Sequence, residues 1–391
     1  MFYLNQLGMI CALGDNHAEI SRRLFAGDSG VAMTRRHSAG RELALGCVES
    51  VLPDIDSLPL RHRSRNNQLA LAALAQIRPQ VDAAIQRFGP HRVAIVLGTS
   101  TSGIAQTEAA FRYRLANGEL PADFRYAQQE MASPAVTLAA ELGVSGPSYV
   151  HSSACASSTK AMASAARLLN MGICDAVLTG GVDSLCGFTI AGFAALESVS
   201  AARCNPFSAN RNGINIGEGA ALFLMTKAEA TVSLRGWGES SDGYHISAPD
   251  PSGKGALIAM EQALERAGLK SAQCDYINLH GTATVQNDAM EGRAIAALFG
   301  DQVALSSTKP FTGHTLGAAG AVEAGLCWLA MQDANPQGYL PPHLWDGVSD
   351  PLLPQLNLQA VGSRLGHPLR LALSNSFAFG GANASLVLGR E

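Results

Sequence analysis

Short apolar runs bounded by glycine alternate with alanine-rich stretches along most of this 391-residue chain. The runs that we interpret as buried strands are HRVAIVLGTS (91–100), DAVLTGG (175–181) and DYINLHG (275–281). The stretches with helical spacing are ASSTKAMASAARLLNMG (156–172), GALIAMEQALERAGL (255–269) and GAAGAVEAGLCWLAMQ (317–332). Strands that alternate with helices predict an α/β protein whose sheet is mostly buried under helices.

Two matches hint at an internal duplication. IVLGTST (95–101) and INLHGTAT (277–284) are both strands that run into a Gly-Thr-x-Thr turn, and a glycine pair follows a strand in each half, at 180–181 and 380–381. Matches this short also arise by chance, but they fit a duplicated α/β unit joined near residues 226–238. We expect the polar, glycine-punctuated segment NPFSANRNGINIGEG (205–219) on the surface or lining an entrance.

Composition narrows the function classes. Hydrophobic residues make up 47% of the chain and charged residues 15%, which suits a compact protein and argues against disorder or a coiled coil. The net charge of −4 gives no reason to expect nucleic acid or an anionic membrane as partner. We see no secretory signal and no apolar run long enough to span a membrane, so we expect a cytoplasmic protein with reduced thiols. The eight cysteines include no Cys-x-x-Cys pair, which argues against a structural zinc site.

Cys155 lies in HSSACASSTKAMAS (151–164), within a stretch from Leu142 to Cys174 that has no Asp or Glu. If a helix begins near Cys155, its free N–H groups and dipole favour a reactive thiolate. The alternative is an inert core thiol.

Two histidines follow at strand and helix boundaries. His280 ends a strand before a Gly-Thr turn, and His314 precedes an expected helix whose dipole would keep its imidazole neutral. Lys309 and Glu323 flank His314 and are placed to pair with each other. The alternatives are structural histidines and ordinary solvated charges.

The segment NSFAFGGANAS (375–385) places Phe377 and Phe379 before the Gly-Gly turn that starts at Gly380. Such a turn offers backbone N–H donors for an oxyanion and a bulky side chain as a gate, although glycine turns between strands are common.

In this order and setting, the chain resembles the elongating β-ketoacyl–acyl carrier protein synthases. The resemblance extends from LGMICALG and FAGDSGV through PFSANRNGINIGEGA (206–220) and SDGYHISAPDP (241–251) to FAFGGANAS. It implies a thiolase-like fold with two pseudo-duplicated halves in a five-layered α/β/α/β/α arrangement, normally a dimer. We place the two halves at residues 1–233 and 234–391.

The resemblance also implies roles for single residues. Cys155 is the acyl-accepting nucleophile, and His280 and His314 are the decarboxylation pair. Lys309 and Glu323 correspond to a pair that orients His314, and Thr282 and Thr284 to threonines that hold the pantetheine arm. Phe379 corresponds to the gating phenylalanine, whose N–H joins that of Cys155 in the oxyanion hole. No metal or other cofactor is expected, because the substrates arrive on the phosphopantetheine of a carrier protein.

The partners follow from the same resemblance. An acidic acyl carrier protein is expected to dock on Arg61, Arg63 and Arg65, with Arg203 as a further basic contact, unless these form only a solvated basic turn. The second subunit is either an identical chain or a related ketosynthase or chain-length subunit. The primer, the product length and the pathway (fatty acid, polyketide or polyene) stay open.

Two residues depart from the family pattern, and three rival functions remain. Ala283 stands where many relatives have glycine or serine, which we expect to matter little. Ala378 stands where relatives have glycine, and its Cβ is expected to alter gate opening and acyl-chain preference. The rivals are a coenzyme A thiolase, a Cys-His hydrolase and a non-catalytic subunit. A thiolase needs a second cysteine near the C-terminus, and this chain has none after Cys327. A Cys-His hydrolase would leave Lys309 without a role. Retention of Cys155 and both histidines argues against the third.

Overall fold

The computed structural model of the chain describes residues 1–38 and 40–391, which contain a ten-stranded sheet and a small two-stranded sheet. The strands are β1 (Phe2–Cys11), β2 (Val31–Thr34), β3 (Leu43–Gly46), β4 (Val93–Gly98), β5 (Ser148–His151), β6 (Ala176–Asp183), β7 (Gly219–Thr226), β8 (Val232–Ser241), β9 (Tyr276–Asn278), β10 (Ala304–Ser306), β11 (Leu371–Ala378) and β12 (Ala382–Arg390). The helices are α1 (His17–Ala26), α2 (Arg65–Phe88), α3 (Ile104–Asn117), α4 (Ser133–Leu142), α5 (Ser157–Asn170), α6 (Gly187–Ala195), α7 (Lys254–Ala267), α8 (Val285–Phe299), α9 (Lys309–Thr312) and α10 (Ala319–Ala330).

The large sheet is two copies of one five-stranded pattern. The first copy has the order β1-β7-β6-β4-β5 and the second β8-β12-β11-β9-β10. In both copies the first three strands pair antiparallel and the remaining pairs are parallel. In the described strands, hydrogen-bonded pairing between the two copies is limited to Phe2 and Tyr3 of β1, which pair with Leu234 and Ser233 of β8. The predicted duplication is therefore present, with its join in the short link between β7 and β8.

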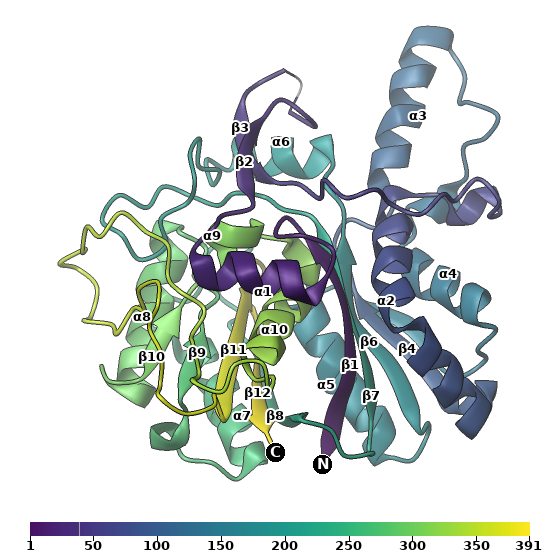
Figure 1. Ribbon diagram of the computed structural model, residues 1–391. Coiled ribbons are helices and arrows are strands. Elements are labelled where there is room, and N and C mark those ends of the chain that lie inside the picture. The colour runs from purple at the N-terminus through teal and green to yellow at the C-terminus, as the bar shows by residue number, and fades with distance from the viewer. Residues whose placement is uncertain (39) are drawn as a thin grey trace.

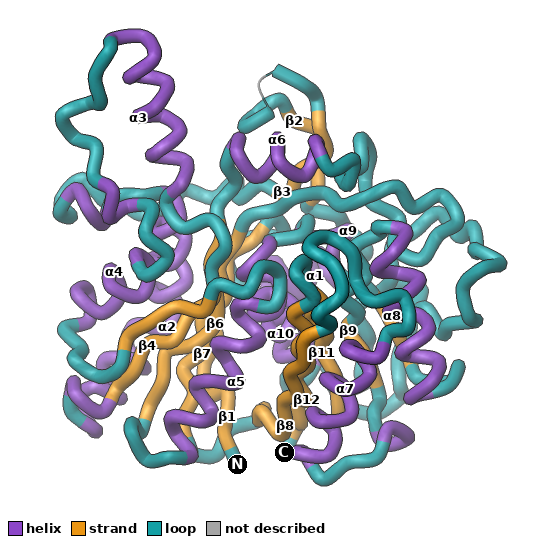
Figure 2. The backbone as a smooth tube through the Cα atoms, turned by 180° about the vertical axis from the view of Figure 1, so that it is seen from behind, coloured by secondary structure: helices purple, strands orange, loops and turns teal. Residues whose placement is uncertain are grey.

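Helices form three layers around the two halves of the sheet (Figures 1 and 2). One apolar cluster joins α2 and α4 to the outer face of the first half, and another joins α7 and α8 to the second half. Between them lies a central cluster that contains α5, α10 and the inner faces of both halves. Along β7, Phe223 faces this central cluster and Leu222 the outer one, as the alternation of side chains in a strand requires. The predicted five-layered arrangement is confirmed.

The central helices are packed closely enough to bring the functional loops together. All twelve residues of α10 are buried. A Cβ on Gly320 would lie 1.9 Å from the Thr159 hydroxyl of α5, so the two helices meet at a position without a side chain. A Cβ on Gly98 would lie 2.2 Å from the backbone N of Ser158, so the N-terminus of α5 rests directly on the end of β4. These contacts hold the start of α5 against the sheet.

The two Gly-Thr-x-Thr turns follow β4 and β9, which occupy equivalent places in the two halves. In the first turn, the hydroxyls of Thr99 and Thr101 donate to the buried Asp183 carboxylate at 2.6 and 2.8 Å. In the second, the hydroxyls of Thr282 and Thr284 lie 3.0 Å from each other and face a cavity. The two backbones differ, because Gly281 and Ala283 have positive φ in the second turn, whereas beside the first turn the positive φ falls on Ser102. One sequence pattern thus serves two different purposes.

Some details differ from the sequence-based expectations. The glycine pair at 180–181 lies inside β6, whereas the pair at 380–381 forms the hairpin turn between β11 and β12, so the pairs are not equivalent. Segment 205–219 is mostly buried rather than on the surface, because it packs between the loop that carries Asp346 and Asp350 and the loops that carry the two histidines. Ile214 nevertheless lines the cavity. Among the helices of the described chain, none has the length and hydropathy that crossing a membrane requires.

Candidate active site

Cys155 lies in the turn between β5 and α5. Helix α5 begins at Ser157, with Ala156 as its N-cap, so the thiol stands beside the free N–H groups of the first helical turn. Ala154 has a φ of +47°, a left-handed conformation that is uncommon for a residue with a Cβ. The chain therefore bends sharply immediately before the cysteine and presents it away from the strand.

Two histidines from the second half of the chain face this thiol. His280 follows β9, and His314 lies in the loop between α9 and α10. The Sγ atom of Cys155 is 3.0 Å from Nε2 of His314. The two imidazole rings are 5.4 Å apart at an interplanar angle of 81°. One ligand atom from each of these three buried residues lies within 4.8 Å of the other two.

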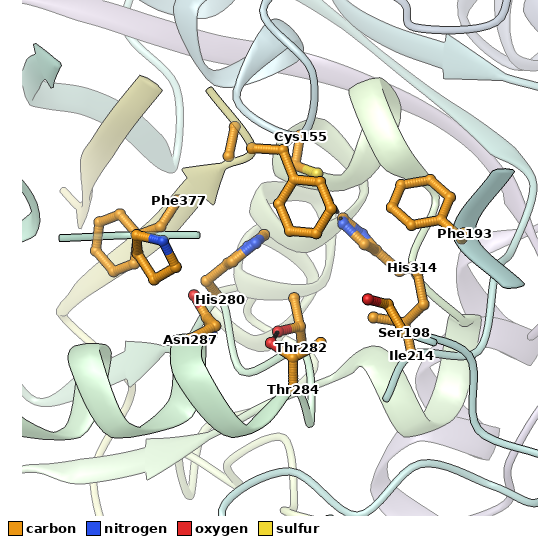
Figure 3. A pocket seen from close by; sticks show the side chains of 13 residues that line it. Cys155, Phe193, Ser198, Ile214, His280, Thr282, Thr284, Asn287, His314 and Phe377 are labelled. Carbon is orange, nitrogen blue, oxygen red and sulfur yellow. Dashed lines mark hydrogen bonds between the residues drawn. The ribbon is translucent and has the colours of Figure 1, made fainter. Parts of the chain in front are cut away.

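The three side chains meet in a small cavity between the two halves (Figure 3). Thr282 and Thr284 form its floor in the view of Figure 3, with Asn287 beside them. The cavity is lined by Cys155, Phe193, Ser198, Ile214, Pro249, His280, Thr282, Thr284, Asn287, His314, Phe377, Ala378 and Phe379. Of these, the sequence analysis did not single out Phe193, Ser198, Ile214, Pro249 or Asn287, which carry no motif of their own.

Lys309 and Glu323 form a buried ion pair, with side-chain exposures of 1% and 2%. The ammonium of Lys309 also lies 3.4 Å from Nδ1 of His280. The sequence-based expectation that this pair orients His314 is therefore wrong, because the observed contact is with the other histidine. An ammonium can only donate, so Nδ1 of His280 accepts and its Nε2 carries the proton.

Burial controls the protonation of the site. Burial and the charge of Lys309 hold the pKa of His280 and of His314 well below the usual value, so both imidazoles are neutral. Burial also raises the pKa of the Cys155 thiol to about 12, although Lys309 and a hydrogen bond from the Phe379 N–H act in the opposite direction. Desolvation therefore opposes the thiolate that the helix dipole was expected to favour. The resting group is a thiol facing His314.

The hairpin turn after β11 closes one side of the cavity. The Phe379 ring lies 5.7 Å from the ring of Phe193 on α6, and the backbone N–H of Phe379 acts to lower the pKa of the Cys155 thiol. Phe377 packs edge-on against His280 at 6.1 Å. Ala378 is buried in a small cluster with Cys155. Gly380 is exposed and has a φ of +82°, which a residue without Cβ adopts readily.

Two buried carboxylates on α8 hold the loop that carries His280. Glu291 accepts from the N–H groups of His280 and Gly281 at 2.8 and 2.7 Å. Asp288 accepts from the N–H of Ala283 at 3.2 Å. Ala283 has a φ of +64°, a conformation that a Cβ disfavours. The alanine at this position therefore strains the turn, although the sequence suggested that it would matter little. The sequence analysis missed both acids, although their spacing of three residues on one helix face was visible.

The four predicted docking arginines are not alike. Arg65 binds the buried carboxylate of Glu218 at 2.6 and 2.8 Å, so its role as a docking residue is corrected to an internal ion pair. Arg63 donates to the backbone O of Leu58 at 2.6 Å and is half-buried. Arg61 and Arg203 are exposed. Of the four, these last two are the most open to a partner, although Nε of Arg61 donates to Nε2 of His62 at 3.0 Å.

The arrangement in the cavity supports nucleophilic chemistry by the thiol. A thiol sits beside one neutral imidazole that can take its proton, and a second neutral imidazole presents an N–H to the same space. Within the described chain, Cys155, His280 and His314 are also the one cluster with metal-ligand geometry.

Comparison with known proteins gives concordant matches. Residues 7–230 match the model of the β-ketoacyl synthase N-terminal domain, and residues 231–344 match that of the C-terminal domain. The chain is 33% identical to nodulation protein E of Rhizobium sp. (strain N33) over 97% of both chains. It is 30% identical to 3-oxoacyl-[acyl-carrier-protein] synthase 2 of Staphylococcus aureus over 85% of this chain and 86% of that one.

Among solved structures, a ketosynthase (ApeO) in complex with its chain length factor (ApeC) from Xenorhabdus doucetiae superposes with a TM-score of 0.93 at 43% identity. The match covers 100% of this chain and 98% of that chain. The ishigamide ketosynthase/chain length factor matches with a TM-score of 0.89 at 25% identity, covering 100% and 99%.

Proposed function

The chain belongs to the β-ketoacyl synthase family, and from this premise we propose that Cys155, His280 and His314 carry out its reaction. The enzyme is an acyltransferase that condenses an enzyme-bound acyl group with malonyl-acyl carrier protein, with loss of carbon dioxide. The observation that carries the assignment of residues is that the donor atoms of all three lie within 4.8 Å of one another in one cavity.

The first half-reaction loads the acyl group. The sulfur of Cys155 attacks the carbonyl carbon of the acyl thioester, and its proton passes through Nε2 of His314, 3.0 Å away, to the departing pantetheine sulfur. The negative charge on the carbonyl oxygen is held by the N–H groups of Cys155 and Phe379. Because the pKa of the free thiol is about 12, this proton transfer accompanies the attack rather than precedes it.

The second half-reaction forms the carbon–carbon bond. The thioester oxygen of the malonyl group accepts hydrogen bonds from the Nε2–H of His280 and, once the ring proton of His314 has moved from Nδ1 to Nε2, from His314. Both stabilise the charge that grows there as carbon dioxide leaves. The resulting enolate attacks the acyl-enzyme carbonyl, and the Cys155 sulfur leaves and takes the Nε2 proton of His314, which regains a proton at Nδ1 from solvent. Neutral imidazoles suit this role, and the low pKa values of both histidines keep them neutral. Thr282 and Thr284 hold the pantetheine arm on the cavity floor.

No step of this cycle changes the oxidation state of an enzyme group or needs a metal-bound water. We therefore propose that the enzyme works without a metal or organic cofactor beyond the carrier's phosphopantetheine. Undiminished condensation after exhaustive chelation and dialysis supports this, and activity restored only by an added metal contradicts it.

The residue assignment is tested by separating the half-reactions. Cys155→Ala should abolish acyl loading, read as the mass of the intact chain after incubation with acyl carrier proteins, and keep carbon dioxide release from malonyl carrier protein. His280→Ala should abolish carbon dioxide release and keep acyl loading. Cys186→Ala is the matched control, because this buried cysteine lies outside the cavity lining and should retain both activities. A loaded Cys155→Ala chain would refute the assignment, whereas free acid release would favour a hydrolase.

The acyl carrier protein docks, we propose, on Arg61 and Arg203. Both are exposed, and Arg203 precedes Cys204, whose N–H donates to Asn215 beside the cavity residue Ile214. An acidic carrier would be drawn to such charges.

The second subunit is, in our proposal, a related chain-length subunit rather than a second copy. Two structural relatives are described as pairs of a ketosynthase and a chain length factor. Helix α3 projects from the body of the molecule (Figures 1 and 2) and exposes Phe111 and Leu115, and the neighbouring α6 exposes Phe188. Strand β5 ends the sheet order, so one of its edges is available for pairing.

The heterodimer is tested by co-expression with a chain-length-type subunit and measurement of the mass in solution. Leu115→Glu should prevent association, because Leu115 is 88% exposed on the projecting helix. Leu352→Glu is the control, since Leu352 is similarly exposed but lies in a distant loop near the C-terminus. Association that survives Leu115→Glu, or a stable pair of identical chains under the same conditions, would contradict the proposal.

A further inference from the structure

The carboxylate of Asp183, at the end of β6, is fully buried and holds the turn that follows β4. It accepts from both the backbone N–H and the hydroxyl of Thr101, each at 2.8 Å, and from the Thr99 hydroxyl at 2.6 Å. The backbone N–H of Ser100 reaches both of its oxygens, at 2.8 and 3.0 Å. The carboxylate thus fixes the position and direction of Ser100.

Ser100 passes this order on to the nucleophile turn. Its hydroxyl donates to the backbone O of Ala154 at 3.1 Å. The same carbonyl oxygen accepts from the hydroxyl and the N–H of Ser157, at 2.6 and 3.2 Å. Ala154 is the residue with φ +47°, so its carbonyl is held from two sides in a conformation that the backbone does not favour by itself.

A carbonyl held at Ala154 also aims the next N–H. The peptide unit is planar and trans, so its C=O and N–H point in opposite directions. The C=O of Ala154 and the N–H of Cys155 belong to the same peptide unit. We infer that Asp183 and Ser100 are positioning residues that aim the Cys155 N–H at the oxyanion of the reacting carbonyl; this rests on the proposed function.

This role differs from holding the thiol itself. Misaiming one oxyanion donor slows reactions that pass through a tetrahedral oxyanion, that is, acyl loading and the attack of the enolate. It leaves a reaction of the same sulfur at a saturated carbon unaffected, because no oxyanion forms there. It also spares decarboxylation, in which the charge lies at the two histidines.

The test compares two reactions of one sulfur in the Ser100→Ala variant. The variant should load acyl groups from the carrier thioester that the wild type accepts fastest about tenfold more slowly, less than the hundredfold or more seen when a donor is removed outright. Alkylation of Cys155 by iodoacetamide should proceed at the wild-type rate, as should carbon dioxide release from malonyl carrier protein. Asp183→Asn should show at least the same loss in loading; because it removes a buried charge, Ser100→Ala carries the test.

Ser102→Ala is the matched control. Ser102 lies in the same turn and its hydroxyl also donates to a backbone carbonyl, but that of Glu130, at 2.8 Å. This variant should load at the wild-type rate. Equal losses in loading and alkylation, an unchanged loading rate in Ser100→Ala, or the same loss in Ser102→Ala would each overturn the inference. If the wild type itself accepts no acyl group, the proposed function fails instead.

Discussion

Replacement of Lys309 by methionine tests how the buried ion pair supports catalysis. Lys309 and Glu323 have side-chain exposures of 1% and 2%, so removal of the ammonium leaves a carboxylate in the core without a counter-charge. Loss of one partner of such a pair typically lowers the free energy of unfolding by about 3–5 kcal/mol. Urea unfolding at pH 8 should show a loss in this range.

The loss should depend on pH in a defined direction. Burial raises the pKa of Glu323 to about 7 even beside Lys309, and without the ammonium the pKa rises further. When a carboxyl group has a higher pKa in the folded than in the unfolded state, the free energy of unfolding falls as the pH rises, until the pH passes the folded-state pKa. In the wild type, this decrease in the free energy of unfolding ends near pH 7. In Lys309→Met, the free energy of unfolding continues to fall above pH 7, by up to about 1.4 kcal/mol per pH unit. The gap between them should therefore widen from pH 7 to pH 8.

A second substitution separates stability from catalysis. Lys309→Met combined with Glu323→Leu removes both charges and should recover most of the free energy of unfolding. It should not recover decarboxylation at low pH, because Lys309 is one of the causes of the low pKa of His280. The acid limb of carbon dioxide release should move to higher pH in both variants. An unmoved acid limb, or a double variant no more stable than Lys309→Met, would refute the reasoning.

Three further results are expected. Ala378→Gly should change the preferred acyl-chain length, because Ala378 lines the cavity beside Cys155; an unchanged product profile contradicts this. Ala283→Gly should raise the free energy of unfolding by about 1 kcal/mol, since a φ of +64° suits glycine. Ala109→Gly, at an exposed position in the interior of α3, should lower it by a similar amount. Arg61→Glu should raise the KM for the carrier protein without changing the melting temperature of the enzyme. Arg65→Glu should lower the melting temperature, because it places a second carboxylate against Glu218; equal effects at the two positions would contradict the distinction.

Local patterns predicted much of this molecule. The alternation of strands and helices depends on near neighbours in the chain, as do the helix start beside Cys155 and the turn after His280. These features were visible in the sequence and lie where the patterns placed them. The repeated Gly-Thr-x-Thr turn likewise indicated the duplication that the strand orders now show.

Contacts between distant segments were not predictable in the same way. Arg65 and Glu218 are separated by 153 residues, and no local signal distinguishes Arg65 from the exposed Arg61. The contact of Lys309 with His280 rather than His314 depends on how α9 packs against the end of β9. The pKa of Cys155 depends on how completely the two halves close over the thiol, which no stretch of sequence records.

The two Gly-Thr-x-Thr turns leave the enzyme unequally open to change. In the first half, the hydroxyls donate hydrogen bonds to the buried Asp183 carboxylate, so an exchange there removes hydrogen bonds that the interior cannot replace. In the second half, α8 holds the backbone of the turn, and the two hydroxyls face the active-site cavity. Altered preference for the thioester arm can therefore arise by exchanging side chains in the second copy, with the framework that supports the nucleophile left intact.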